Sequence, residues 1–204
     1  MNIKQTVYQD GNIGCLVFLP GRNGHSSDLK QFYTIKDFKM IGFDAQEKEW
    51  YSKPNGIKDQ TEAISSLEKN RKIIQAEIEK IEMPKNRIAL IGFSAGGVAA
   101  VWTAINDKEE YAIAMAHSGA ILDLNNIPPP PKFNKMSIIM AHGKEDDVFG
   151  YEERFIPSIE ALRKKGYTVG KITNPKGKHT IELDDAETIE ALLYNKLFVF
   201  NSFK

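Results

Sequence analysis

The stretch Ile88-Ala-Leu-Ile-Gly-Phe-Ser-Ala-Gly-Gly97 decides how this chain folds. It begins with an apolar run typical of a buried strand, and the residues after Ser94, to about Asn106, are apolar nearly all round, as in a buried helix. Between them stands Gly92-x-Ser94-x-Gly96, which raises a serine above a sheet edge at the positive end of a helix. This context predicts that Ser94 is a nucleophile. The alternative is that small residues here only let the strand and helix pack closely.

Outward from this turn, short apolar runs alternate with amphipathic stretches, which is the pattern of a mostly parallel sheet flanked by helices. We expect an α/β-hydrolase fold, compact and without a large lid domain, over residues 1–204 as one domain. An antiparallel edge strand is predicted at Ile3–Tyr8, because its polar and apolar residues alternate and a turn follows it. The other predicted strands are Gly14–Leu19, Lys39–Phe43, Arg87–Phe93, Ala112–Ala116, Ser137–Ala141 and Val169–Ile172, and the other predicted helices include about Asp59–Ile81, Glu152–Lys165 and Ala186–Lys196.

Composition narrows the function classes. Lys plus Arg and Asp plus Glu are 27 each, and this balance favours neither nucleic acid nor an anionic membrane as a partner. The single cysteine, Cys15, excludes an intrachain disulfide and is expected to be a buried structural thiol. Residues 1–9 lack the apolar centre of a signal peptide, and no apolar run is long enough to span a bilayer. A cytoplasmic protein is therefore expected, and its oligomeric state stays open.

A serine hydroxyl needs a base, and the four histidines of the chain provide the candidates. In this fold the order along the chain is nucleophile, acid, histidine, so only His142 and His179 qualify. His179 stands in a loop after the last strand that can reach Ser94, and it is the predicted base. His142 ends a strand and is expected to hydrogen-bond the acid loop, with the role of base as its alternative.

The acid must follow a strand and precede His179. The pattern His142-Gly-x-x-Asp selects Asp146, whose carboxylate would orient the imidazole of His179. Its neighbour Asp147 is the alternative, because adjacent residues can exchange positions in a loop.

Two backbone N–H groups are predicted to hold the oxyanion. One belongs to Ala95, the residue after the nucleophile. The other belongs to Arg22, in the loop Leu19-Pro-Gly-Arg-Asn-Gly24, whose glycines permit an unusual backbone path. The alternative for that loop is an ordinary glycine-rich turn.

Four residues near the expected active-site edge are candidates for the substrate pocket: His25, Trp50, Tyr51 and His117. His117 can equally be a hydrogen-bonded core histidine. Two connecting segments, Ala45–Lys58 and Ser118–Ser137, follow strand ends on this edge and could form an apolar acyl groove, or could belong to the core. The apolar residues of the second segment are Ile121, Leu122, Leu124, Ile127 and Phe133.

Together these motifs resemble the phospholipase/carboxylesterase family of α/β-hydrolases, which includes acyl-protein thioesterases and small bacterial carboxylesterases. The resemblance runs from about Val17 to Leu193. It rests on Leu19-Pro-Gly-Arg-Asn-Gly24 with Asp28, Trp50-Tyr51, Gly92-Phe-Ser-Ala-Gly-Gly97, Ser118-Gly119, His142-Gly-Lys-Glu-Asp146 and His179. The chain departs from the family at Pro20, where the family usually has a histidine that helps to hold the loop, and at Ala95, which is often glutamine.

The resemblance implies hydrolysis of carboxylic esters, lysophospholipids or acyl thioesters through Ser94, Asp146 and His179, without a cofactor or a metal. The partner would be a small-molecule ester or thioester. Two alternatives use the same fold: a non-catalytic binding protein, and a peptidase or acyltransferase with the same three residues.

Overall fold

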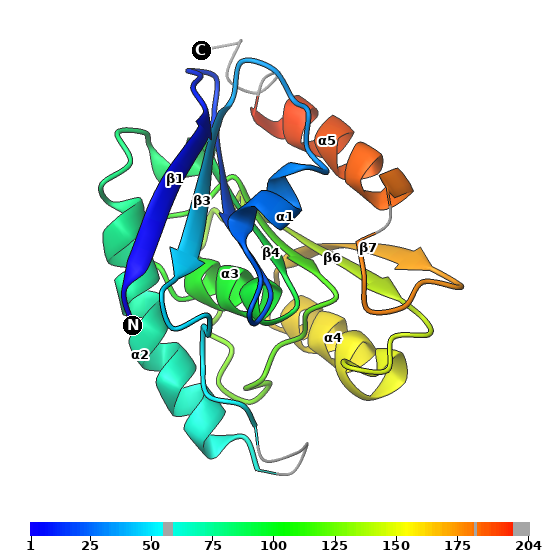
Figure 1. The fold of residues 1–204 in the computed structure, drawn as a ribbon. Helices are drawn as coiled ribbons and strands as arrows, with labels where there is room; N and C mark the ends of the chain where they lie inside the picture. Colours follow the sequence, from blue (N-terminus) through cyan, green and yellow to red (C-terminus); the bar gives the residue numbers. More distant parts are fainter. Residues whose placement is uncertain (55–58, 182, 198–204) are drawn as a thin grey trace.

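The computed structural model of the chain describes residues 1–54, 59–181 and 183–197. These residues form a seven-stranded sheet in the order β1-β3-β2-β4-β5-β6-β7 (Figure 1). Neighbouring strands are parallel except β1 and β3, which run antiparallel, so the predicted antiparallel edge strand is confirmed. The strands are β1 Ile3–Gln9, β2 Cys15–Leu19, β3 Lys39–Ala45, β4 Ile88–Phe93, β5 Ile113–His117, β6 Ser137–Gly143 and β7 Thr168–Asn174. The α-helices are α1 Ser26–Lys30, α2 Thr61–Ile78, α3 Ala95–Ile105, α4 Ile156–Lys164 and α5 Leu183–Leu197.

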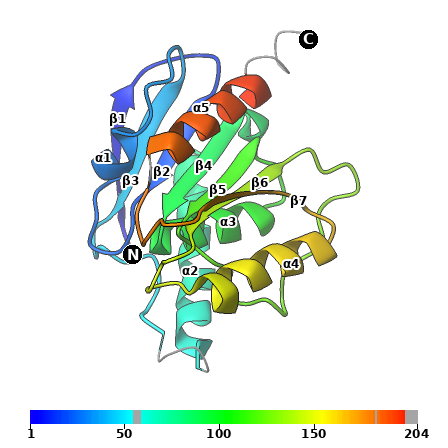
Figure 2. The same ribbon diagram turned by 90° about the vertical axis from the view of Figure 1, so that its right-hand side faces the viewer.

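Helices cover both faces of the sheet, because the side chains of each strand alternate between two hydrophobic clusters. In β2, Cys15, Val17 and Leu19 belong to one cluster, and Leu16 and Phe18 belong to the other. Helices α2, α3 and α4 pack on the first face, and α1 and α5 pack on the second (Figures 1 and 2). Burial on both faces explains why β2 is an uninterrupted apolar run. It also raises the pKa of the Cys15 thiol to about 12, as expected for a structural cysteine.

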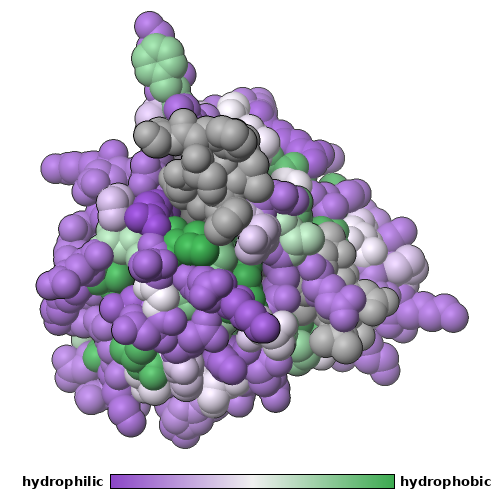
Figure 3. Space-filling view, turned by 90° about the horizontal axis from the view of Figure 1, so that it is seen from above, coloured by the Kyte–Doolittle hydropathy of each residue, from purple (hydrophilic) through white to green (hydrophobic). Residues whose placement is uncertain are grey.

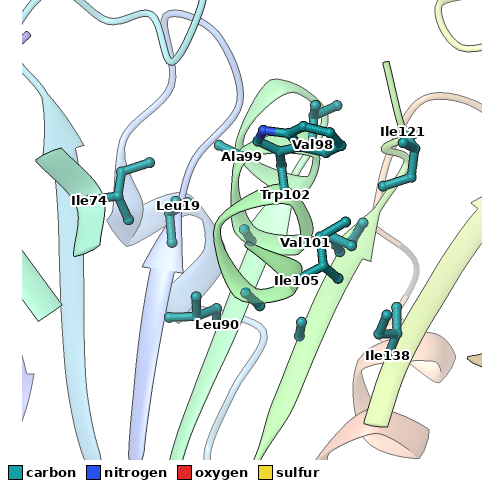
Figure 4. Close-up of a cluster of buried hydrophobic side chains, with 14 of the residues drawn as sticks. Leu19, Ile74, Leu90, Val98, Ala99, Val101, Trp102, Ile105, Ile121 and Ile138 are labelled. Atoms are coloured by element: carbon teal, nitrogen blue, oxygen red, sulfur yellow. The ribbon is translucent and has the colours of Figure 1, made fainter. Parts of the chain in front are cut away.

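Helix α3 is the central helix of the first face, and all of its residues are buried. Figure 4 shows Val101, Trp102 and Ile105 of α3 within the cluster formed by neighbouring strands and helices. The Trp102 indole donates a hydrogen bond to Glu68 Oε2 at 3.1 Å, which satisfies its one polar atom. Helix α3 is packed on every side. Ser94, the residue directly before it, is therefore held in a fixed position above the sheet.

Two predicted helices have different ends in the structure. Helix α2 stops at Ile78, before the predicted end at Ile81, because the Ile81 amide donates to the Ile78 carbonyl and tightens the chain into a turn. The helix predicted from Glu152 instead begins with a π-helical turn at Tyr151–Phe155 and continues as α4. A short 3-10 helix at Lys85–Arg87 leads into β4.

One face of the molecule is mainly polar. Figure 3 shows this face, on which hydrophobic residues form small separate groups. In the part of the chain that the structure describes, no helix has the length and apolar character that a membrane crossing requires.

Candidate active site

Ser94 lies at the sharp turn between β4 and α3, in a backbone conformation that side chains rarely adopt. Its φ is 52° and its ψ is −121°, and its amide donates to the His117 carbonyl of β5 at 2.8 Å. The turn requires glycine at two positions. A Cβ at Gly92 would collide with the carbonyl of Gly96, and one at Gly96 would collide with the carbonyl of Leu19. The pattern Gly-x-Ser-x-Gly therefore reflects the close approach of three backbone segments.

His179 lies between Ser94 and Asp146 and is hydrogen-bonded to both. Its Nε2 is 2.9 Å from Ser94 Oγ, and its Nδ1 is 2.8 Å from Asp146 Oδ2. The three residues come from the turn after β4, the loop after β6 and the loop after β7. Parallel strands present these loops at the same edge of the sheet, which is why residues 85 positions apart in sequence can meet.

Asp146 is held as an ionised acceptor. Its side chain is fully buried, and its Oδ1 accepts the amides of Val148 at 2.9 Å and Phe149 at 2.8 Å. Burial acts to raise the pKa of the carboxyl, but the hydrogen bonds with His179 and these two amides outweigh it and hold the pKa below its ordinary value. Asp147, the alternative acid, is exposed and forms no ion pair or hydrogen bond with His179.

His142 supports the acid loop, as expected from the sequence. Its Nε2 lies 2.6 Å from the Phe149 carbonyl and 3.2 Å from Asp146 Oδ2, and its ring stacks on Phe155 with centroids 4.5 Å apart. Burial lowers the pKa of His142, so the ring is neutral and Nε2–H donates to the carbonyl. It does not contact Ser94, which leaves His179 as the histidine positioned to act as a base.

Two glycines that the sequence analysis did not assign bring the acid loop and the histidine loop together. A Cβ at Gly143 would collide with the carbonyl of Gly177, and the Glu145 amide donates to that same carbonyl at 2.9 Å. The signal in the sequence is the glycine in each loop, one directly after His142 and one two residues before His179. Close contact between these backbones sets the distance from Asp146 to His179.

The loop that contains Arg22 packs directly against Ser94. A Cβ at Gly21 would lie 3.4 Å from the Cβ of Ser94. Among the described residues, the backbone amides of Arg22 and Ala95 have no hydrogen-bond acceptor, and both residues line the same cleft as Ser94. Two unpaired N–H donors beside the Ser94 hydroxyl are the arrangement that stabilises an oxyanion.

The segment after β3 holds this loop in place. Trp50 Nε1 donates to the Pro20 carbonyl at 2.6 Å, and the Asn23 amide donates to the Lys48 carbonyl at 3.0 Å. The Arg22 guanidinium adds a bond to the Tyr51 carbonyl at 3.0 Å. Trp50 was a predicted pocket residue, but its side chain is buried and anchors the loop instead, because its one donor reaches the loop carbonyl.

Two clefts open beside Ser94 and share Arg22. The larger has a volume of about 630 Å³, and among its lining residues are Ser94, Ala95, Tyr51 and Phe149. The smaller is about 210 Å³ and mainly apolar, with Leu29, Phe32, Phe93 and Ile181 in its wall. Tyr51 is the predicted pocket residue that lines a cleft. Residues 147–150, 153 and 154, which form much of the larger wall, were not predicted from the sequence.

The other two predicted pocket histidines line neither cleft. His25 precedes α1 and is exposed, with its Nδ1 3.8 Å from Asp44 Oδ1. His117 is 1% exposed, and its Nε2 lies 2.8 Å from the Tyr33 hydroxyl. It ends β5 below the turn, so it is a core histidine, which was the alternative that the sequence left open.

The buried His117 should make stability depend on pH. Burial lowers its pKa to about 3, whereas the unfolded chain takes up this proton near 6.5. The stabilisation is complete above about pH 6.5 and is lost as the pH falls toward 3. We expect the urea midpoint to fall less between pH 7 and pH 4.5 in His117→Gln than in the wild type. An equal fall of the urea midpoint in the two proteins would contradict the assignment of this pH dependence to His117.

The second predicted acyl-groove segment belongs mainly to the core. Ile121, Leu122 and Ile127 are buried in the cluster around α3, and Phe133 is 80% exposed and lines neither cleft. The first segment does contribute Tyr51, Lys53 and Pro54 to the larger cleft, and its residues 55–58 lie outside the described residues. Within residues 1–54, 59–181 and 183–197, no group of three or more acidic, histidine or cysteine side chains could hold a metal ion.

The fold and this site define the class. A mostly parallel sheet, with a serine at the turn between a central strand and a buried helix, is the α/β-hydrolase fold. Residues 33–193, more than half of the chain, match the phospholipase/carboxylesterase family. The chain belongs to that family.

Curated relatives agree with this assignment. The chain is 33% identical to acyl-protein thioesterase 1 of Neurospora crassa over 129 residues, which are 61% of this chain and 52% of the relative. It is 34% identical to acyl-protein thioesterase 1 homolog 2 of Dictyostelium discoideum over 92 residues, 43% of this chain and 41% of the relative. The matches thus span about half the length of these relatives.

Two solved structures have the same fold. The esterase PE8 superposes with a TM-score of 0.82 at 18% identity, covering 97% of this chain and 100% of that chain. A phospholipase/carboxylesterase from Dyadobacter fermentans superposes with a TM-score of 0.77 at 19% identity, covering 94% and 95%. At these identities the likeness concerns the fold.

Proposed function

We propose that this protein is a serine hydrolase that cleaves carboxylic esters or acyl thioesters through an acyl-enzyme intermediate. The observation that carries the proposal is the position of His179, which is hydrogen-bonded to Ser94 Oγ on one side and to the buried Asp146 on the other. This is the geometry of an activated serine nucleophile. Membership of the phospholipase/carboxylesterase family supports the substrate class.

In the proposed mechanism, His179 Nε2 takes the proton of Ser94 Oγ as the oxygen attacks the substrate carbonyl. Asp146 fixes the ring with its proton on Nδ1 and stabilises the imidazolium that forms. The amides of Arg22 and Ala95 donate to the oxyanion. The carbon–oxygen or carbon–sulfur bond then breaks, and His179 gives its proton to the leaving alcohol or thiol. Water, deprotonated by His179, attacks the acyl group and releases the acid and the free serine.

The two clefts provide separate places for the two halves of such a substrate. Phe93 and Ile181 line the smaller cleft, and both flank His179: the Phe93 ring centroid is 5.0 Å from the imidazole, and Ile181 follows it by two residues. The leaving group receives its proton from His179, so we assign it to this smaller apolar cleft. The acyl half then occupies the larger cleft beside Ser94 and Tyr51.

The test is covalent labelling together with turnover. We expect a fluorophosphonate probe to label the wild-type protein at one site, located on Ser94 by peptide mass spectrometry, and p-nitrophenyl acetate and butyrate to be hydrolysed. A folded protein that neither reacts with the probe nor hydrolyses either ester would instead be a non-catalytic binding protein on this fold. Comparison of an acyl thioester, an oxygen ester and a peptide of matched acyl group then separates esterase, thioesterase and peptidase activity, and acyl transfer is detected by adding an alcohol acceptor.

A further inference from the structure

Arg154 is a cation in the wall of the larger cleft without a negative partner. The cleft also contains Ser94, and Arg154 forms no ion pair with any carboxylate of the described residues. Its guanidinium Nη1 donates to a neutral acceptor, Gln60 Oε1, at 3.2 Å, and its central carbon lies 6.0 Å from the centre of the Phe149 ring. A guanidinium has five N–H donors, so most of its donor capacity is left for another group.

The cleft lining also contains two exposed carboxylates, Asp147 and Glu153, and neither forms an ion pair with Arg154. Arg22 is ion-paired with Glu49 and donates to the Tyr51 carbonyl, so its charge is already compensated. The Glu153 carboxylate folds over the backbone of Gly150. Arg154 is therefore the half-buried cation of this cleft that has no ion-pair partner among the described residues, and the exposed Lys53 adds positive charge to the lining.

The position of Arg154 is set by its backbone and by the ring beneath it. It lies in the π-helical turn that precedes α4, where its amide donates to the Gly150 carbonyl at 3.0 Å and its carbonyl accepts the Ser158 hydroxyl at 2.7 Å. Single π-helical turns are frequent at functional sites. Burial lowers the pKa of the guanidinium, which is the effect of removing a cation from water without supplying an anion. An anionic ligand would complete this arrangement.

We propose that Arg154 binds a carboxylate on the acyl half of the substrate, so that half-esters of dicarboxylic acids are preferred over neutral esters. This inference rests on the proposed function, because the acyl half occupies the larger cleft only if Ser94 is acylated. A planar guanidinium pairs with a carboxylate through two parallel hydrogen bonds, which fixes the acyl chain as well as its charge. Arg154 is thus a specificity-determining residue, and the acyl carbonyl is placed near the Arg22 and Ala95 amides.

The experiment uses two esters that differ only in charge: the mono-p-nitrophenyl ester of adipic acid and the p-nitrophenyl ester of monomethyl adipate. We expect the wild type to have the higher kcat/KM on the charged ester. Arg154→Gln should lower kcat/KM on the charged ester by about 10- to 100-fold, mainly by raising KM. The value of kcat/KM on the neutral ester should change little. Glutamine keeps a donor for Gln60, and Arg154→Lys should retain part of the preference.

Lys164→Gln is the matched control, because it removes one exposed positive charge from the same α4 segment, outside the cleft lining. It should leave kcat/KM unchanged on both esters. Equal losses on the two esters in Arg154→Gln, or equal effects of the Arg154 and Lys164 substitutions, would overturn the inference while leaving the esterase proposal intact. Failure of the wild type to hydrolyse either ester would overturn the esterase proposal and this inference with it.

Discussion

Ser94→Ala is expected to lower kcat for p-nitrophenyl butyrate by about 10³- to 10⁶-fold and to abolish labelling by a fluorophosphonate probe. The substitution removes the oxygen that is hydrogen-bonded to His179 Nε2, at 2.9 Å. The remaining rate would come from the oxyanion donors and from substrate binding. KM should change little, since the clefts are unaltered.

The comparison requires a folded variant and a serine that plays no part in the site. Ser27→Ala is suitable, because Ser27 is an exposed residue of α1 whose side chain lines neither cleft. Thermal unfolding of both variants should follow the wild type closely. Wild-type turnover by folded Ser94→Ala would show that another group is the nucleophile.

Asp146→Asn is expected to lower kcat by about 10⁴-fold, the size of effect known for the same change in a serine protease. The carboxylate accepts from His179 Nδ1 at 2.8 Å and from two backbone amides through its other oxygen. An asparagine that keeps its oxygen toward those amides turns its NH₂ group to His179. The histidine then has to carry its proton on Nε2, where it cannot accept the proton of Ser94.

Asp147→Asn separates the two adjacent acids. Asp147 is exposed and has no hydrogen bond or ion pair with His179, so the loss of kcat should be far smaller than for Asp146→Asn. Steady-state rates at one pH with matched amounts of folded protein are sufficient for the comparison. A larger loss in Asp147→Asn would assign the acid to Asp147.

Much of the fold and of the candidate site could be predicted from local patterns. The uninterrupted apolar runs of β2 and β4 indicated strands buried on both faces, because such strands have no polar side to expose. The all-round apolar sequence after Ser94 indicated a central helix, and all of α3 is buried. The chain order of Ser94, Asp146 and His179 predicted which side chains would meet at the sheet edge.

Pocket residues were harder to predict, because lining a cleft is a property of packing. Trp50 and His117 are both near the site, yet both are buried, and each has its donor or acceptor satisfied by the Pro20 carbonyl or the Tyr33 hydroxyl. Arg154 falls within the predicted helix Glu152–Lys165, and the sequence did not indicate that it would line a cleft. Its position follows from the π-helical turn, which has no recognised signature in the sequence.

The sequence by itself determined the strand-turn-helix that presents Ser94 and predicted its candidate acid and base, since periodicity, glycine spacing and the order of motifs along the chain can be read without the fold. Only the tertiary structure decided which carbonyl holds the Arg22 loop, which backbones touch at Gly143, and which cation remains unpaired in the cleft. Those outcomes depend on contacts between segments far apart in the chain, where distances of a few tenths of an ångström decide whether two groups bond.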